Sequence, residues 1–215
     1  MNFLEQLKAQ ASAVRSGRDV QQLGQEASTQ ATEQACTTVL LYLQDMARQL
    51  NVIEPDGPRL TLDGRTPWPD MKLNGFQVDA RKKVLRDKEV FDFIGVGWRI
   101  VPRSGRPVTG VVSANFPPDL QRLEARLTAG WVQHERHEVR DPEKNKLQLV
   151  RVEYCTHSRG NILVTPDHHD AKLAFRLANL TGFGVLSTAW PVSQVNSGML
   201  DELAKLVCGQ PSHFL

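Results

Sequence analysis

Two histidines and one cysteine near the middle of the chain have the side-chain types that zinc binding or nucleophilic catalysis requires. They are His134, Cys155 and His157. Imidazole and thiolate are common zinc ligands, and a thiolate beside an imidazole is also a nucleophile beside its base. Both kinds of chemistry need the three side chains to converge. Their convergence depends on two predicted strands, residues 131–140 and 147–159, which we expect to form an antiparallel hairpin.

The charges of this hairpin predict how its strands pair. Directly opposed residues of an antiparallel pair share a face, and opposite charges there contribute about 0.2–1 kcal/mol. One register opposes Arg136 to Glu153. The same register opposes Glu138 to Arg151, so both pairs are attractive. Moving the register by two residues in either direction opposes like charges, and we therefore expect the attractive register.

The attractive register brings the three candidate residues onto one face of the hairpin. It places His134 opposite Cys155, with His157 two residues further along. The sequence therefore offers a candidate zinc site, and zinc is the one cofactor that it suggests. No fourth ligand points to this site. The simpler interpretation is a polar hairpin face whose histidines and thiol have no chemical role.

A second group of candidate metal ligands lies at a predicted turn. His168 and His169 stand between Asp167 and Asp170. Imidazole and carboxylate groups both bind metals, so His168 and His169 are candidate ligands. Aspartate also collects at turns because its side chain hydrogen-bonds to the nearby backbone. A turn without a metal is therefore the alternative.

Motifs for phosphate binding and catalysis are absent from the sequence. The stretch Gly95–Val96–Gly97 lacks the third glycine of a dinucleotide motif and lies inside a predicted strand. The densest basic run, residues 81–88, is diluted by acidic residues and fits the solvated edge of a hairpin better than a phosphate track. We therefore do not expect nucleic acid as a partner. No nucleophile elbow, P-loop or metalloprotease signature points to an enzyme.

The composition predicts a soluble globular protein. The 215 residues are 40% hydrophobic and 23% charged, with a net charge of +2, which excludes a disordered or collagen-like chain. The three widely spaced cysteines, Cys36, Cys155 and Cys208, predict reduced thiols and a cytoplasmic location. The N-terminus has no signal-peptide pattern. The longest aliphatic run near it, residues 39–43, is far shorter than the roughly 20 residues of a membrane span.

Alternating polar and apolar residues predict strands over most of the chain after residue 70, and residues 90–101 are instead apolar on both faces, as expected of a central strand. The strands are expected near residues 76–84, 90–101, 108–116, 131–140, 147–159, 161–165, 172–178 and 185–190. Residues 172–178 also fit a helix, but the glycines that follow favour a hairpin. A short helix is expected between Pro117 and Gly130, and another near residues 199–207. Because hairpin follows hairpin, we expect an α+β fold: a largely antiparallel sheet of about six to eight strands with N-terminal helices, one short mid-chain helix and a C-terminal helix.

The first quarter of the chain is predicted to be helical. The apolar spacing indicates one helix over residues 2–16, a break at Gly17, and a longer helix from Asp19 to Leu50. Prolines and glycines in residues 54–70 indicate a connector. The chain is thus expected to divide into a helical segment (1–53), this connector and an antiparallel α+β body (71–215), which could together form one domain.

These features favour a binding or assembly protein without catalytic activity, acting through protein–protein contacts. The sheet can cover the bulky residues of the second helix, whereas the alanine-rich stripe over residues 20–35 has no obvious partner within the chain. We expect a second copy of this helix to cover the stripe in a two-fold homodimer. A partly frayed, exposed helix is the alternative to dimerisation. The alternative function is a metal-binding protein or an enzyme that uses the His/Cys cluster.

Overall fold

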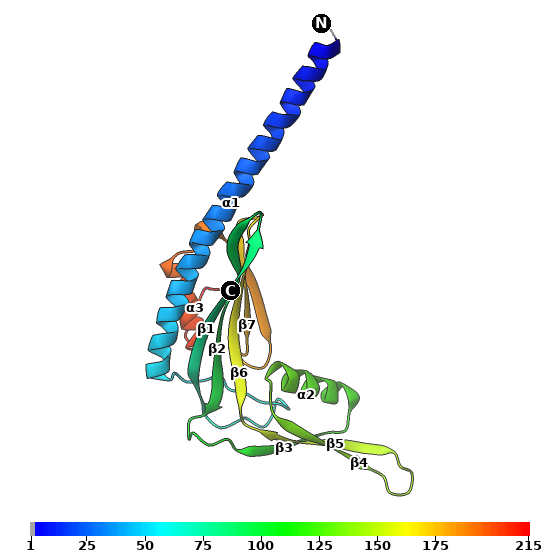
Figure 1. Cartoon of the computed structure of the whole chain (residues 1–215). Coiled ribbons are helices and arrows are strands. Elements are labelled where there is room, and N and C mark those ends of the chain that lie inside the picture. Colours follow the sequence, from blue (N-terminus) through cyan, green and yellow to red (C-terminus); the bar gives the residue numbers. More distant parts are fainter. Residues whose placement is uncertain (1–2) are drawn as a thin grey trace.

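The chain begins with one long helix. The structure, a computed structural model, describes residues 3–215, apart from the side chains at positions 9, 13 and 17–20. Helix α1 spans Phe3–Ile53, and its N-terminal half extends away from the rest of the chain (Figure 1). The predicted break at Gly17 is wrong, because one glycine costs a helix only about 1 kcal/mol while a break requires a second nucleation. No helix in the described residues combines the length and the apolar character that a membrane span requires.

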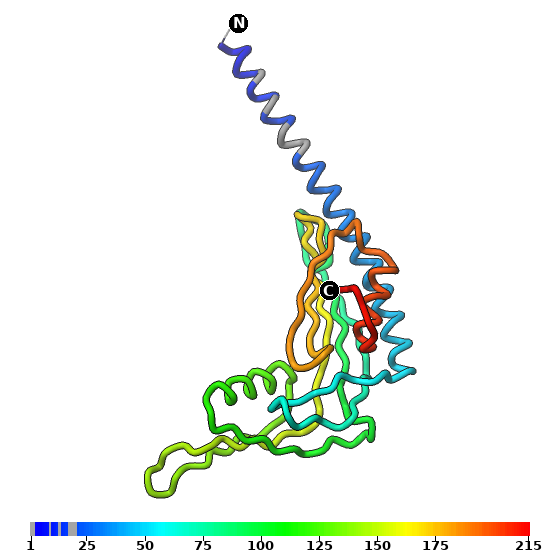
Figure 2. The backbone as a smooth tube through the Cα atoms, turned by 180° about the vertical axis from the view of Figure 1, so that it is seen from behind, coloured from blue at the N-terminus to red at the C-terminus, as the bar shows by residue number. Residues whose placement is uncertain are grey.

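The C-terminal half of α1 packs on the body of the protein. Its buried residues recur every three or four positions along one face: Ala35, Cys36, Val39, Leu43, Met46, Ala47 and Leu50. Helix α3, Ser197–Val207, lies beside this half of α1 (Figure 2). The Tyr42 hydroxyl of α1 donates a 2.6 Å hydrogen bond to Asp201 of α3. The two helices together cover one face of the main sheet.

Five antiparallel strands form the main sheet, in the order β1-β2-β6-β7-β8. The strands are Met71–Leu85 (β1), Lys88–Pro102 (β2), Ser158–Asp167 (β6), Lys172–Ala178 (β7) and Val185–Pro191 (β8). Residues 172–178 are therefore a strand, and the hairpins β1–β2 and β7–β8 are those that the alternation predicted. Strand β2 is internal, as its apolar sequence indicated.

A smaller sheet lies at one end of the main sheet. It contains Thr109–Ala114 (β3), His134–Arg140 (β4) and Leu147–Cys155 (β5), in the order β3-β5-β4. Helix α2, Pro117–Ala129, connects β3 to β4, and it starts with two prolines and ends at Gly130 as predicted. A short 3-10 turn, Val192–Gln194, precedes α3. In the described residues, eight antiparallel strands and three α-helices confirm the predicted α+β class.

The predicted register of the β4–β5 hairpin is wrong by one residue. Arg136 lies opposite Val152 rather than opposite Glu153. Its guanidinium pairs instead with Glu124 of α2 at 2.8 Å and with Glu138 at 3.3 Å. The turn sets the register, because Asp141 accepts two backbone N–H bonds within it and a bulge follows in the ladder. These contacts outweigh the weak cross-strand charge pairs on which the prediction depended.

The two faces of the main sheet differ in how they are covered. On β2, Ile94, Val96, Trp98 and Ile100 point into the core and are buried. The residues between them point to the other face, which no helix covers (Figure 1). Two of these are glycines, Gly95 and Gly97, and the next is the exposed Arg99. Because glycine has no side chain, the surface of the open face is hollowed along the middle of β2.

Candidate functional site

The register separates two of the three predicted zinc ligands. His134 lies opposite Tyr154, so its side chain and that of Cys155 are on opposite faces of the hairpin. The Nδ1 atom of His134 lies 2.9 Å from the Val132 carbonyl oxygen. Cys155 pairs with Thr109 of β3 at the end of its strand. The premise that brought His134 and Cys155 together is therefore wrong.

His157 lies in the short turn between β5 and β6. Burial lowers the pKa of its imidazole, and the positive charges of Arg159 and Arg99 lower it further. This environment is electropositive. Among the side chains that the structure describes, no three of His, Cys, Asp or Glu are placed to hold one metal ion. Metal binding by His134, Cys155 and His157 stays a prediction, but the register on which that prediction was based is wrong.

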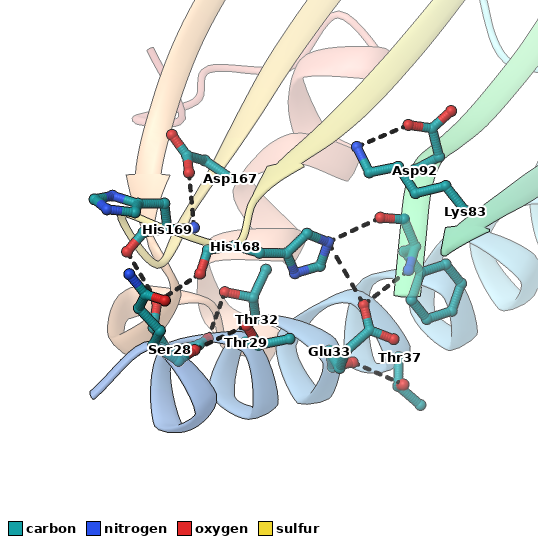
Figure 3. A network of polar contacts seen from close by, with 12 residues as sticks. Ser28, Thr29, Thr32, Glu33, Thr37, Lys83, Asp92, Asp167, His168 and His169 are labelled. Atoms are coloured by element: carbon teal, nitrogen blue, oxygen red, sulfur yellow. Dashed lines mark hydrogen bonds and ion pairs between the residues drawn. The ribbon is translucent and has the colours of Figure 1, made fainter. Parts of the chain in front are cut away.

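His168 is a buried contact between the main sheet and α1. Its side chain is only 5% exposed, and Nε2 lies 2.9 Å from the Phe91 carbonyl oxygen. The Phe91 N–H donates a 2.8 Å hydrogen bond to Glu33 of α1. The Glu33 carboxylate is also 3.8 Å from His168 Nε2 (Figure 3). This geometry makes Nε2 a donor to Phe91, which is a structural role.

The backbone next to His168 completes the attachment of α1. The Ser28 hydroxyl lies 2.8 Å from the His168 carbonyl oxygen and 3.1 Å from that of His169 (Figure 3). We call Ser28, Glu33, Phe91 and His168 the anchor cluster. His169 itself is exposed, and its Nδ1 atom lies 2.9 Å from Asp170. The structure thus gives His168 a packing role and leaves a metal role for His168 and His169 as an untested prediction.

The anchor cluster marks the point at which α1 leaves the body. From Ser28 onward the helix packs on the sheet, and Thr32 and Ala35 are buried. We call residues 3–27 the projecting segment and residues 28–53 the docked segment. The expectation that residues 20–35 lack a partner within the chain is therefore wrong for residues 28–35. The side chain of Val20 lies outside the described residues.

Three exposed apolar side chains of the projecting segment share one face of the helix, whereas Leu23, which is 66% exposed, lies on the opposite side. Phe3 is 71% exposed, Leu7 44% and Val14 54%. These three residues are separated by four and seven positions, so they form one stripe on the helix. Ser28 is two heptads beyond Val14 and lies on roughly the same side. The exposed stripe is therefore a continuation of the face that packs on the body.

A groove of about 530 Å³ lies where the projecting segment passes the turn of the β1–β2 hairpin. Gln21, Gln25 and Thr29 line it from α1, and Arg86 and Lys88 line it from the turn. Most of its lining is polar. The groove is lined in part by residues of the projecting segment itself.

The buried thiols are not activated nucleophiles. Burial raises the pKa of Cys36 to about 12, and the nearby Glu33 carboxylate adds to the effect. Burial also raises the pKa of Cys208. A thiol attacks as its thiolate, so a raised pKa lowers its reactivity. Neither cysteine is suited to nucleophilic catalysis.

Comparison of the chain with models of known protein families, with curated proteins and with solved structures found no match.

The anchor cluster could not be read from the sequence, although one signal was present. Ser28 and Thr32 are polar residues placed among the alanines of an apolar stripe. Polar residues at buried helix positions need hydrogen-bond partners, so their spacing indicated a contact with another element. It did not indicate which element, because the partner carbonyls lie 140 and 141 residues away.

Proposed function

We propose that the chain is a binding and assembly protein without catalytic activity that forms a two-fold homodimer through the projecting segment of α1. One observation carries this proposal: Phe3, Leu7 and Val14 form an exposed apolar stripe on a helix that leaves the body. Most helices in proteins are stabilised by packing of an apolar face rather than by propensity alone. A second copy supplies such packing for this stripe.

The position of the body favours an antiparallel pair. Because the stripe lies on the side of α1 that packs on the body, a parallel second copy would bring two bodies into the same space. An antiparallel pair with its axis at Val14 keeps them apart. Val14 is eleven residues from Phe3 and eleven from Gln25. Phe3 of one copy therefore meets Gln25 of the other, at the groove beside the β1–β2 turn.

We also propose that the protein works in the cytoplasm. Cys36, Cys155 and Cys208 are all free thiols. Free thiols persist in reducing compartments, whereas secreted domains of this size commonly pair their cysteines.

Two matched double variants test the dimer by light scattering. Leu7→Glu with Val14→Glu places two charges in the stripe and keeps good helix formers in α1. Leu41→Glu with Val52→Glu makes the same pair of changes on the docked segment, where the two side chains are 61% and 83% exposed. We expect the natural chain and the control to have the mass of two chains, and the stripe variant to have the mass of one.

Two results would overturn this proposal. If the natural chain stays monomeric at micromolar concentrations, there is no dimer. If the stripe variant stays dimeric while the control dissociates, the interface lies on the docked segment instead.

A further inference from the structure

The open face of the main sheet contains a groove of about 660 Å³, a size typical of small-molecule sites. It lies across β1, β2 and β6, away from the face that α1 covers. We call it the arginine groove. Its lining includes Gln77, Gly97, Arg99, Trp131, Arg159 and Asn161. It is separate from the projecting segment, so it is independent of the proposed dimer.

Two arginines face each other across the central strands of this groove. Arg99 of β2 is the direct cross-strand partner of Arg159 of β6. Like charges directly opposed in a sheet are destabilising. Among the described residues, neither arginine forms an ion pair that would offset the repulsion. The pair therefore keeps two guanidinium groups available for an anion.

Backbone geometry positions the first of these arginines. Gly75 lies in a bulge of β1 between Asn74 and Gln77, with φ at 66°. A Cβ atom at this position would lie 3.0 Å from Nε and 3.1 Å from an Nη atom of Arg99. The guanidinium thus packs directly over the glycine backbone. Gly75 leaves the space that the Arg99 side chain occupies.

Trp131 stands beside the arginines in an unfavourable backbone conformation. Its φ is 51°, a left-handed value that bulky residues rarely adopt and that glycine usually supplies after a helix. Its side chain is 71% exposed, so core packing does not explain the residue. Such strained residues cluster at binding sites, where the surrounding structure holds them in place.

Two buried polar side chains hold Trp131 close to Arg159. The Ser158 hydroxyl donates a 2.7 Å hydrogen bond to the Gly130 carbonyl, next to the tryptophan. The Asn179 amide donates to the carbonyls of Ala129 and Arg159, each at 2.7 Å. The same amide therefore joins the end of α2 at Ala129 to β6 at Arg159. The backbone at Trp131 and the backbone at Arg159 thus have a fixed relative position before any ligand arrives.

At the floor of the groove, two side-chain amides flank a glycine, and the glycine leaves open space between them. Gly97 lies between its two cross-strand partners, Gln77 and Asn161. The Asn161 Oδ1 atom is buried and has no hydrogen-bond partner in the described part of the chain. Asp79, at the far end, can accept hydrogen bonds from hydroxyl or amino groups.

We propose that the arginine groove binds a nucleotide, with its phosphate between Arg99 and Arg159 and its base stacked on Trp131. Guanidinium groups bind phosphate through paired charge-assisted hydrogen bonds. An exposed indole is a stacking surface for any base. Gln77 and Asn161 line the groove beside the arginines, and their amides can donate or accept further hydrogen bonds.

Calorimetric titration of the full chain tests the site with AMP, GMP, CMP and UMP, and with adenosine and inorganic phosphate as separate arms. We expect at least one nucleotide to bind with a Kd below about 1 mM, and adenosine and phosphate to bind at least about tenfold more weakly.

Arg99→Gln and Arg159→Gln are each expected to weaken binding about tenfold. Arg81→Gln removes an arginine from the same sheet face outside the groove and should leave the Kd unchanged. Trp131→Ala should weaken binding, and Trp131→Phe should restore part of it.

The proposal is overturned if none of the four nucleotides binds, or if inorganic phosphate alone binds as tightly as a nucleotide. It is also overturned if Arg81→Gln weakens binding as much as Arg159→Gln does. A ten-residue RNA that binds far more tightly than any nucleotide would replace the small ligand with nucleic acid. Circular dichroism of each variant confirms that it is folded.

Discussion

The Ser28 hydroxyl of α1 lies 2.8 Å from the carbonyl oxygen of His168, in the turn between β6 and β7. This contact joins two parts of the chain that are 140 residues apart. The neighbouring Glu33 accepts a hydrogen bond from Phe91, so one helix holds both β2 and the β6–β7 turn. These polar contacts, together with the apolar packing of the docked segment, fix the position of the projecting segment relative to the sheet.

His168→Ala is expected to lower the free energy of unfolding by about 2 kcal/mol, because it leaves the buried Phe91 carbonyl without its partner and creates a cavity. His169→Ala is the matched control, since that side chain is 72% exposed, and its effect should be within about 0.5 kcal/mol. Urea unfolding of the two variants measures the difference. Equal losses in both variants would contradict a specific role for the anchor cluster.

Trp131→Gly is expected to be more stable than Trp131→Ala by about 1 kcal/mol. Glycine adopts the positive φ of this position without strain, whereas alanine keeps the Cβ atom that causes it. Thermal unfolding of both variants under identical conditions measures the difference. If alanine were the more stable of the two, the backbone at residue 131 would not be strained.

Asp63 makes the stability of the connector depend on pH. Burial disfavours its ionised form, but hydrogen bonds from the Thr66 and Arg65 backbone outweigh burial and lower its pKa from 3.8 to about 2. A carboxylate with a lowered folded-state pKa stabilises the fold above pH 3.8, and this contribution is lost as the pH falls toward 2. Because the carboxylate is exposed, we expect about 1 kcal/mol rather than the full converted shift.

The Asp63→Asn variant isolates this contribution from that of other acidic groups. We expect the natural chain to be more stable than the variant at pH 5 and the two to converge near pH 2. Urea unfolding at three pH values gives the curve. A difference that stays constant across this range would show that the Asp63 charge does not contribute.

The titration of His157 is expected to report the charge of the arginine groove. Its pKa should lie below 6.5 in the natural chain, since burial first and then Arg159 and Arg99 disfavour the protonated ring. Arg159→Gln removes one of these charges and should raise the pKa, whereas Arg81→Gln should not. Nuclear magnetic resonance titration of the imidazole signals measures it. A pKa that is equal in the two variants would remove Arg159 from the surroundings of His157.

The lowered His157 pKa also sets a direction for stability. Above pH 6.5 the ring is neutral in both the folded and the unfolded chain. As the pH falls below that value, the unfolded chain takes up the proton first, so stability declines. This decline should be smaller in Arg159→Gln.

Local patterns predicted the elements, and long-range contacts decided how they pair. Period-2 alternation located β1 and β7, an apolar run located β2, and the prolines and glycine around α2 located its ends. The β4–β5 register was missed because Arg136 finds Glu124 on α2, a residue that no hairpin argument includes. The continuous α1 was missed because Gly17 is a weak breaker inside a long helix.

The candidate binding residues were missed for a related physical reason. Arg99, Trp131 and Arg159 come from three separate elements, and each is unremarkable within its own segment. Their relation exists only after β2 pairs with β6 and after the turn at Gly130 is held by Ser158 and Asn179. In contrast, His134 and Cys155 looked related because they are close in a hairpin, where a shift of one residue is enough to separate them.

The projecting segment extends from Ser28 as a rigid arm, so a small change in its tilt there moves its tip a long way. Twenty-five helical residues give an arm of about 38 Å. A tilt of about 10° at Ser28 would move its tip by about 7 Å, using the same rise per residue. A sideways displacement of the tip therefore acts on the contacts that Ser28 and Glu33 make with the β6–β7 turn and β2.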